Sequence, residues 1–288
     1  MNIPYNPTRL FTFGCSYTSW SWPTWADILG AELQRRGDCE VHNFGEGGAG
    51  NQFIAQQISM VDLTHNFTKD DLVIVCWSEI FREDRYIENT PGYSDGWVLA
   101  GGIQDASIYP LDKLAKITGP MHVGIRDYSL MYYVNSLLEK TTTRYISKFD
   151  FSKYNAIVDN IFPEKSNEFL ELTNIFKTAT KNIQHSFEEL TMAPRRKSLS
   201  KEFLDLHPFP LDHLTFLTDI CDIEISSDIK EEVYNAQDAL YEMINVYLAD
   251  ISHPLEDIVK YNGDSLTLLA YTYKKHNLMS TRARELPF

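Results

Sequence analysis

A serine follows the first predicted strand at a position where parallel α/β sheets bind ligands. Residues 9–13 form a short β-rich run that ends at Gly14, and Ser16 comes two residues later, ahead of a helix predicted over Trp25–Arg36. Ligands of such sheets bind beyond the carboxyl ends of the strands, where the free N–H groups of a helix favour negative charge. The position therefore suits a nucleophilic hydroxyl and a developing oxyanion. A turn with a helix cap is the alternative, because Gly-x-Ser after a strand is common.

A glycine-rich segment follows the second predicted strand. This strand covers residues 40–44, the segment covers residues 45–50, and a helix is predicted directly after it over residues 51–63. Glycine lets the backbone approach a ligand closely and point its N–H groups toward it. A phosphate-binding loop is the alternative, but the Walker lysine is missing and the fingerprint spacing is wrong.

The third chemical element lies far along the chain. His207 stands two residues after Asp205 and directly before Pro208, ahead of another predicted helix. A histidine beside a carboxylate suits a general base with an orienting partner. The alternative is a surface loop whose Asp212 caps the helix. His213 competes for the role of base, but it falls inside the predicted helix, where a structural histidine is expected.

The elements that position these residues alternate between strands and helices. Residues 71–77 form a continuous apolar run bounded by acidic residues, as expected for a strand buried on both faces. A fourth strand is predicted over residues 142–149. Short links between strands and helices predict an α/β three-layer sandwich, with a parallel, flavodoxin-like central sheet flanked by helices. Further helices are predicted over residues 127–140, 167–190, 211–220 and 227–250.

The domain organisation follows from the breaks in this pattern. Residues 81–126 contain several glycines and no sustained period, which predicts a long irregular insertion of the kind that is often functional. We expect one α/β domain over residues 1–222 and a helical C-terminal extension over residues 223–288 packed on it. The apolar face of the first helix in this extension either packs on the same domain, which is the commoner outcome, or mediates self-association.

Composition excludes several functional classes. The chain has 288 residues, 43% of them hydrophobic, which is enough for a full core. A net charge of −14 repels a phosphate backbone and anionic membranes, so no nucleic acid or membrane partner is expected. The four cysteines form no CxxC pair, so neither a zinc site nor a disulfide framework is predicted. No signal peptide or transmembrane segment is recognisable, which favours the cytoplasm, including the case of a virus-encoded protein.

Together the three chemical segments resemble the SGNH hydrolases, also called GDSL esterases and lipases. The Gly-Asp-Ser of this family matches Gly14-Cys15-Ser16, and its Asn-x-Gly-x-x-Gly pattern matches residues 43–48. Its final Asp and His before a Pro match Asp205, His207 and Pro208. The resemblance covers roughly residues 9–220, apart from the insertion. A Trp-Ser-x-x-x-Arg segment at residues 77–82 is similar to that of SGNH-like proteins in phage and marine bacterial genomes.

The resemblance implies a serine esterase that needs no cofactor. Ser16 would be the nucleophile, His207 the general base and Asp205 its orienting carboxylate, while Gly48 would donate its N–H to the oxyanion. The acyl-serine intermediate would pass to water, or to another hydroxyl in an O-acyltransferase that uses the same residues.

Three positions depart from the family pattern. Cys15 replaces an aspartate that is not catalytic, and Asp205 lies two residues before the histidine rather than three. The asparagine that normally follows the third strand is missing, so Ser78 or Asn51 would have to supply this oxyanion donor. Losing one donor costs about 10²–10³ in rate. Both an altered but active enzyme and a non-catalytic binding or virion-structural protein on the same scaffold are therefore compatible with the sequence.

Aromatic side chains gather near the predicted strand ends. Trp20 and Trp22 follow the serine, and Trp77 closes the third strand. Their rings could stack on sugars or hold an acyl group, although packing of the first helix on the sheet is an equally good explanation. With Tyr17 and Arg82 they form the predicted substrate lining. The expected substrate is an O-acyl ester, in particular an O-acetyl ester, on a carbohydrate or a related small molecule.

Overall fold

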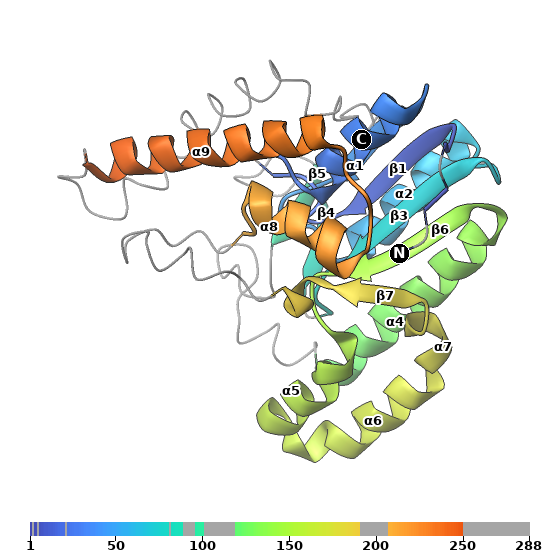
Figure 1. Cartoon of the computed structure of the whole chain (residues 1–288). Helices are drawn as coiled ribbons and strands as arrows, with labels where there is room; N and C mark the ends of the chain where they lie inside the picture. Colours follow the sequence, from blue (N-terminus) through green and yellow to red (C-terminus); the bar gives the residue numbers. More distant parts are fainter. Residues whose placement is uncertain are drawn as a thin grey trace.

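Five parallel strands form the central sheet of the computed structural model, which describes residues 1, 3–4, 6–20, 22–80, 82–88, 96–100, 119–190 and 207–249. The sheet order is β2-β1-β3-β6-β7 (Figure 1). This is the flavodoxin-like order, so the predicted α/β architecture is confirmed. The strands are β1 (Arg9–Gly14), β2 (Glu40–Gly45), β3 (Asp71–Trp77), β6 (Thr142–Ser147) and β7 (Ile183–Ser186).

Strand register brings the chemical segments to one edge of the sheet. Gly14 at the end of β1 pairs with Gly45 at the end of β2, and Phe13 pairs with Val75 of β3. Every residue of β3 is buried, because helices cover both faces of a parallel sheet. The three chain segments that follow these strands therefore leave the sheet side by side, at its carboxyl edge.

Helices flank the sheet on both sides (Figure 1). Their bounds are Trp25–Arg36 for α1, Asn51–His65 for α2, Pro120–Leu137 for α4, Tyr154–Ile161 for α5, Ser166–Ile175 for α6, Lys177–Thr180 for α7, Pro210–Thr215 for α8 and Ser227–Ala249 for α9. A π-helix at Phe216–Ile220 continues α8, and short 3-10 helices lie at Leu138–Lys140, Phe151–Lys153, Pro163–Lys165 and Phe187–Glu189. Helix α1 contacts α8 and α9, whereas α2 packs against α4, which in turn contacts α6 and α7.

The predicted irregular insertion contains regular structure at both ends. An antiparallel hairpin joins β4 (Glu83–Ile87) to β5 (Gly96–Ala100), and α4 begins at Pro120 rather than at residue 127. Glu83 and Asp84 are buried, so charged residues occupy positions where a strand usually shows apolar ones. For α4, the proline after Gly119 is an ordinary helix-start signal. Residues 89–95 and 101–118 lie outside the described residues.

The prediction of one helix over residues 167–190 is wrong. Helix α6 ends at Ile175, α7 covers four residues, and β7 then adds a fifth strand to the sheet. Helix α5 was not predicted either. Strands and helices this short contain too few residues to show a period.

The C-terminal helix packs on the rest of the chain. Helix α9 matches its predicted extent to within one residue, and its apolar face is buried at Val233, Ala236 and Leu240. This face therefore contacts the same domain, the commoner of the two expected outcomes. Residues 191–206 and 250–288 lie outside the described residues, and the boundary near residue 222 stays a prediction. Within the described part, no helix has the length and hydropathy needed to span a membrane.

Candidate active site

Ser16 and His207 meet at the carboxyl edge of the sheet. The Nε2 atom of His207 lies 2.7 Å from Ser16 Oγ, although 191 residues separate them in the sequence. Ser16 is 3% exposed and His207 is half-buried. This is hydrogen-bond distance, the geometry in which a histidine can take the proton of a nucleophilic hydroxyl. The structure thus brings together the two residues that the sequence singles out most strongly.

A tight turn after β1 presents Ser16. The backbone N–H of Thr18 donates to the carbonyl of Cys15 at 2.8 Å, and Thr24 Oγ1 donates to the carbonyl of Thr18 at 2.6 Å. A Cβ atom at Gly14 would lie 2.1 Å from Thr18 Oγ1, so only glycine fits beneath the turn. The glycine before Ser16 is therefore a steric requirement of the turn.

Asn43 ties this turn to its neighbours. Its Nδ2 donates to the Thr18 carbonyl at 3.0 Å and to Asp27 of α1 at 3.3 Å. Its Oδ1 accepts hydrogen bonds from Thr12 at 3.1 Å and from the Gly45 N–H at 3.0 Å. Sequence reasoning gave Asn43 no role of its own, although it opens the Asn-x-Gly-x-x-Gly pattern. It joins the ends of β1 and β2 to the turn that carries Ser16.

Two tryptophans hold the histidine segment. The Trp20 ring stacks on the His207 imidazole, with 3.8 Å between ring centroids and 20° between planes. Trp22 Nε1 donates to the Pro208 carbonyl at 2.8 Å. Trp22 is 1% exposed, so it supports this segment from the protein interior and does not line a surface that substrate could reach. Asp205, the predicted orienting carboxylate, lies outside the described residues.

The structure also decides the roles of Asp212 and His213, the two alternatives in this segment. Asp212 Oδ2 accepts a hydrogen bond from the Phe209 N–H at 2.9 Å, so it caps α8. His213 is 1% exposed inside α8, and burial lowers its pKa to about 3. A neutral buried imidazole beside Phe187 is a structural residue, as expected.

The glycine loop packs against the serine turn. The Glu46 N–H donates to the Gly14 carbonyl at 3.0 Å, and a Cβ atom at Gly45 would lie 2.8 Å from Thr18. Gly48 has a φ of 82°, in the left-handed region that favours glycine. The loop therefore follows the chain beside Ser16, and the Gly48 N–H keeps its predicted role as a candidate oxyanion donor.

Arg82 holds the far end of this loop, which corrects its predicted role in lining substrate. It is 6% exposed, and its Nη1 donates to the Ala49 carbonyl at 3.1 Å. Asp84 accepts hydrogen bonds from the N–H groups of Gly50 at 2.9 Å and Phe53 at 3.0 Å, which caps the start of α2. Both side chains come from the segment around β4, so the hairpin anchors the loop.

Asn51 is not free to donate to an oxyanion, contrary to one of the two expectations. Its Nδ2 donates to Asp127 Oδ2 at 2.8 Å and to the Ser78 carbonyl at 3.2 Å, and its Oδ1 accepts from the Ser78 N–H at 2.8 Å. The Ser78 hydroxyl, by contrast, is buried and has no hydrogen-bond partner within the described ranges. It is therefore the better candidate of the two.

A buried ionic cluster lies behind these donors. Arg126 Nε donates to Asp127 Oδ1 at 2.6 Å, its Nη2 donates to the Arg82 carbonyl at 2.6 Å, and its Nη1 pairs with Glu83. Burial raises the pKa of Asp127 to about 7, although the Arg126 charge and the hydrogen bonds from Arg126 and Asn51 lower it. Sequence reasoning missed Asp127. The feature that could have pointed to it is its position as a single acidic residue on the apolar face of α4, in line with Val123, Met131 and Val134.

The remaining predicted lining residues differ in their surroundings. Tyr17 lies beside His207, with 5.8 Å between ring centroids, and Lys148 Nζ lies 5.0 Å from the centre of the Tyr17 ring. Lys148 forms an ion pair with Glu79. Trp77 is fully buried in the core, so its predicted contact with substrate is wrong. Tyr17 and Trp20 are thus the predicted aromatic residues that lie next to the histidine.

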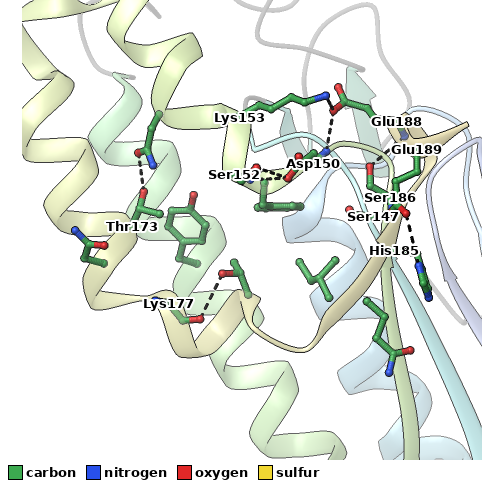
Figure 2. Close-up of a pocket in the computed structure, with 17 residues that line it drawn as sticks. Ser147, Asp150, Ser152, Lys153, Thr173, Lys177, His185, Ser186, Glu188 and Glu189 are labelled. Carbon is green, nitrogen blue, oxygen red and sulfur yellow. Dashed lines mark hydrogen bonds and ion pairs between the residues drawn. The ribbon is translucent and has the colours of Figure 1, made fainter. Parts of the chain in front are cut away.

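A separate cavity of about 560 Å³ lies beside α6, α7 and β7 (Figure 2). Polar side chains line it, among them Thr173, Lys177 and Ser186, and Lys153 pairs with Glu188 at 2.6 Å. Among the predicted site residues that the structure describes, none belongs to its lining. The cavity is therefore distinct from the candidate active site.

Comparisons with known proteins give distant likenesses. No family model matches the chain, and no curated protein does. A member of the lipolytic protein G-D-S-L family from Veillonella parvula is similar over 75% of this chain and 97% of that chain, with 13% identity and a TM-score of 0.37. The acetylxylan esterase Axe2 from Geobacillus stearothermophilus is similar over 78% and 100%, with 14% identity and a TM-score of 0.41. The first of these carries the name of the family that the sequence motifs resemble. Likenesses this distant carry no argument about activity, which has to come from the site.

Proposed function

We propose that this protein is a serine hydrolase that cleaves carboxylic esters through an acyl-Ser16 intermediate, with His207 as the general base. The observation that carries the proposal is the 2.7 Å contact between Ser16 Oγ and His207 Nε2 at the carboxyl edge of the sheet. Nucleophile and base within hydrogen-bond reach are the structural signature of covalent catalysis. A purely structural or binding role gives no reason for this contact at the ligand-binding edge of the fold.

The mechanism follows from the positions of these residues. His207 takes the proton of Ser16 as the Ser16 oxygen attacks the ester carbonyl carbon, and the carbonyl oxygen becomes an oxyanion. His207 then gives the proton to the departing alcohol. His207 next takes a proton from water as the water oxygen attacks the acyl carbon, and it returns this proton to the Ser16 oxygen as the acid leaves. Asp205 would orient the imidazole during both steps.

Three donors would hold the oxyanion. The backbone N–H groups of Ser16 and Gly48 are two of them, and the Ser78 hydroxyl replaces the missing asparagine. A buried hydroxyl without a partner costs about 1–3 kcal/mol. An oxyanion that forms beside Ser78 would supply the missing acceptor, so this interaction would be made in the transition state, where it accelerates the reaction.

The substrate class we favour is an O-acetyl ester on a neutral carbohydrate. Trp20 is half-buried beside His207 and offers an aromatic surface on which a sugar can pack. The net charge of −14 disfavours an anionic substrate. An O-acyltransferase would use the same residues, and the fate of the acyl group distinguishes the two reactions.

Turnover of p-nitrophenyl acetate, together with acetate release from acetylated xylo-oligosaccharides, tests the proposal. Wild type should release acetate, and Ser16→Ala and His207→Ala should not. Ser59→Ala is a matched control, because its hydroxyl donates to a carbonyl of its own helix, and it should keep full activity. Transfer of the acetyl group to an added sugar rather than to water would indicate the acyltransferase. A folded wild type that turns over none of these esters would contradict the proposal.

A further inference from the structure

A buried carboxylate underlies the two chain segments that carry the proposed oxyanion donors. Asp127 of α4 is 0% exposed, its Oδ2 accepts from Asn51 Nδ2 at 2.8 Å, and its Oδ1 accepts from Arg126 Nε at 2.6 Å. No step of the mechanism uses it. A buried ion pair is often no more stable than well-packed apolar residues of similar volume, so stability alone gives little reason for an aspartate here.

Asn51 connects this carboxylate to both segments. Its Oδ1 accepts a hydrogen bond from the Ser78 N–H at 2.8 Å, which fixes the backbone that carries the Ser78 hydroxyl. As the first residue of α2, Asn51 also directly follows the glycine loop that contains Gly48. One amide group, held by Asp127, therefore joins the loop after β2 to the end of β3.

A second connection runs from the same cluster to the loop. Arg126, which binds Asp127, also donates to the Arg82 carbonyl at 2.6 Å. Arg82 in turn holds the Ala49 carbonyl at 3.1 Å, one residue after Gly48. Both connections therefore hold the end of the loop that follows Gly48, at Ala49 and Asn51, and both lead back to Asp127.

We propose that Asp127 is a positioning residue that fixes, through Asn51, the spacing between the Gly48 N–H and the Ser78 hydroxyl. The inference rests on the proposed function, because it takes these groups as oxyanion donors. Such donors act when they are already set about 2.7–3.1 Å from the place where the oxyanion forms. A displacement of about 1 Å can cost roughly a hundredfold in rate. Loss of Asp127 should therefore affect the transition state more than substrate binding.

Steady-state kinetics of Asp127→Ala and Asp127→Asn test this role, with Asp71→Ala as the matched control. Asp71 is also a buried aspartate bonded to an arginine, but it lies at the start of β3, away from the site. Asp127→Ala should lower kcat about ten- to a hundredfold and leave KM within about twofold. Asp127→Asn should lose less, because its amide oxygen can still accept from Asn51. Asp71→Ala should lose stability and keep both kinetic constants.

A double-mutant cycle separates positioning from general destabilisation. Because Asp127 acts mainly through Asn51, the combined substitution of Asn51→Ala and Asp127→Ala should lower kcat by clearly less than the product of the two single losses. Fully additive losses would overturn the inference, and so would an unchanged kcat in a folded Asp127 variant. If Asp127→Ala does not fold, Asp127→Asn with a measured thermal transition decides the matter. An inactive wild type would contradict both the proposed function and this inference. An active wild type whose kcat does not change when Asp127 is substituted would contradict the inference alone.

Discussion

Two buried aspartates, each bonded to an arginine, stand at opposite ends of the same sheet. At the amino end, Asp71 accepts hydrogen bonds from Arg9 Nε and Nη2, both at 2.7 Å, and from the Thr68 N–H at 2.6 Å. Burial would raise the pKa of Asp71, but these hydrogen bonds lower it below its usual range. At the carboxyl end, burial prevails over Arg126 and Asn51, and the pKa of Asp127 rises to about 7.

The difference separates a part of the molecule built for stability from a part built for chemistry. The buried carboxylate of Asp71 is fully hydrogen-bonded by Arg9 and Thr68, so its charged form stabilises the fold. The carboxylate of Asp127 is held where burial disfavours its charge, and Asn51 links it to the backbone of Ser78. Strongly shifted carboxyl groups of this kind cluster at functional sites. Substitutions at the two ends should therefore have opposite consequences for activity and stability.

The largest contrast is expected between His207 and Asp71. His207→Ala should lower kcat by about 10³–10⁶, because the proton of Ser16 loses its acceptor, while the melting temperature changes little. Asp71→Ala should lower the melting temperature and leave kcat unchanged. Ester turnover and thermal unfolding of both variants measure this contrast. Comparable loss of activity in the two would show that the carboxyl end has no special role.

The next effect concerns Ser78. Ser78→Ala should lower kcat by about 10²–10³ if its hydroxyl replaces the missing asparagine. Folding should be nearly unaffected or slightly improved, since the substitution removes a buried hydroxyl that has no partner among the described residues. A Ser78→Ala enzyme with the kcat of wild type would leave the oxyanion to the two backbone N–H groups.

The dependence of stability on pH should differ in sign at the two ends. The folded-state pKa of Asp127, about 7, lies above its unfolded value of roughly 3.9. Its contribution to the free energy of unfolding is therefore complete below pH 4 and is lost as pH rises to 7. Because the pKa of Asp71 is lowered, its contribution to the free energy of unfolding is present above pH 4 and is lost as pH falls below 4. At about 1.4 kcal/mol per pKa unit, the raised pKa of Asp127 corresponds to a few kcal/mol at most.

Denaturant unfolding across pH 3–8 checks both signs. The difference between wild type and Asp127→Asn should change between pH 4 and 7, and the difference between wild type and Asp71→Asn should change below pH 4. Parallel curves for Asp127→Asn and wild type throughout would mean that Asp127 keeps an ordinary pKa.

The smallest expected effect is that of Trp20. Trp20→Ala removes the ring that stacks on His207 at 3.8 Å and should lower kcat about three- to tenfold, since such ring pairs contribute about 0.5–1.5 kcal/mol. Trp20→Phe keeps a stacking ring and should lose less. If Trp20→Ala instead raised KM for acetylated sugars and left p-nitrophenyl acetate turnover intact, the ring would serve the substrate rather than the base.

The sequence predicts the well-patterned half of the fold. The strands β1, β2 and β3, with α1 and α2 between them, lie within two residues of their predicted bounds, because apolar runs and glycine breaks mark them. Strand β4 is not predicted because its buried positions carry Glu83 and Asp84 instead of apolar residues. Strand β7 is not predicted because it has only four residues. In both cases tertiary contacts, which local pattern does not encode, decide the structure.

The site is predictable where chain order and strand ends determine it. Ser16 and His207 are brought together as expected, but the side chains of Asn51, Arg82 and Trp77 are directed elsewhere by packing and hydrogen bonding. Asp127 is not predicted as a site residue, because a charged residue in a helix usually faces water. Its partner is a helix N-terminus 76 residues away, which no local pattern reveals.

Covalent labelling with a fluorophosphonate, followed by peptide mass mapping, shows directly whether Ser16 is an activated nucleophile. We expect one adduct on wild type, on the peptide that contains Ser16, none on Ser16→Ala, and strongly slowed labelling of His207→Ala. Asp71→Ala should label like wild type. A folded wild type that forms no adduct, or an adduct on another serine, would contradict the assignment of Ser16 as a nucleophile activated by His207.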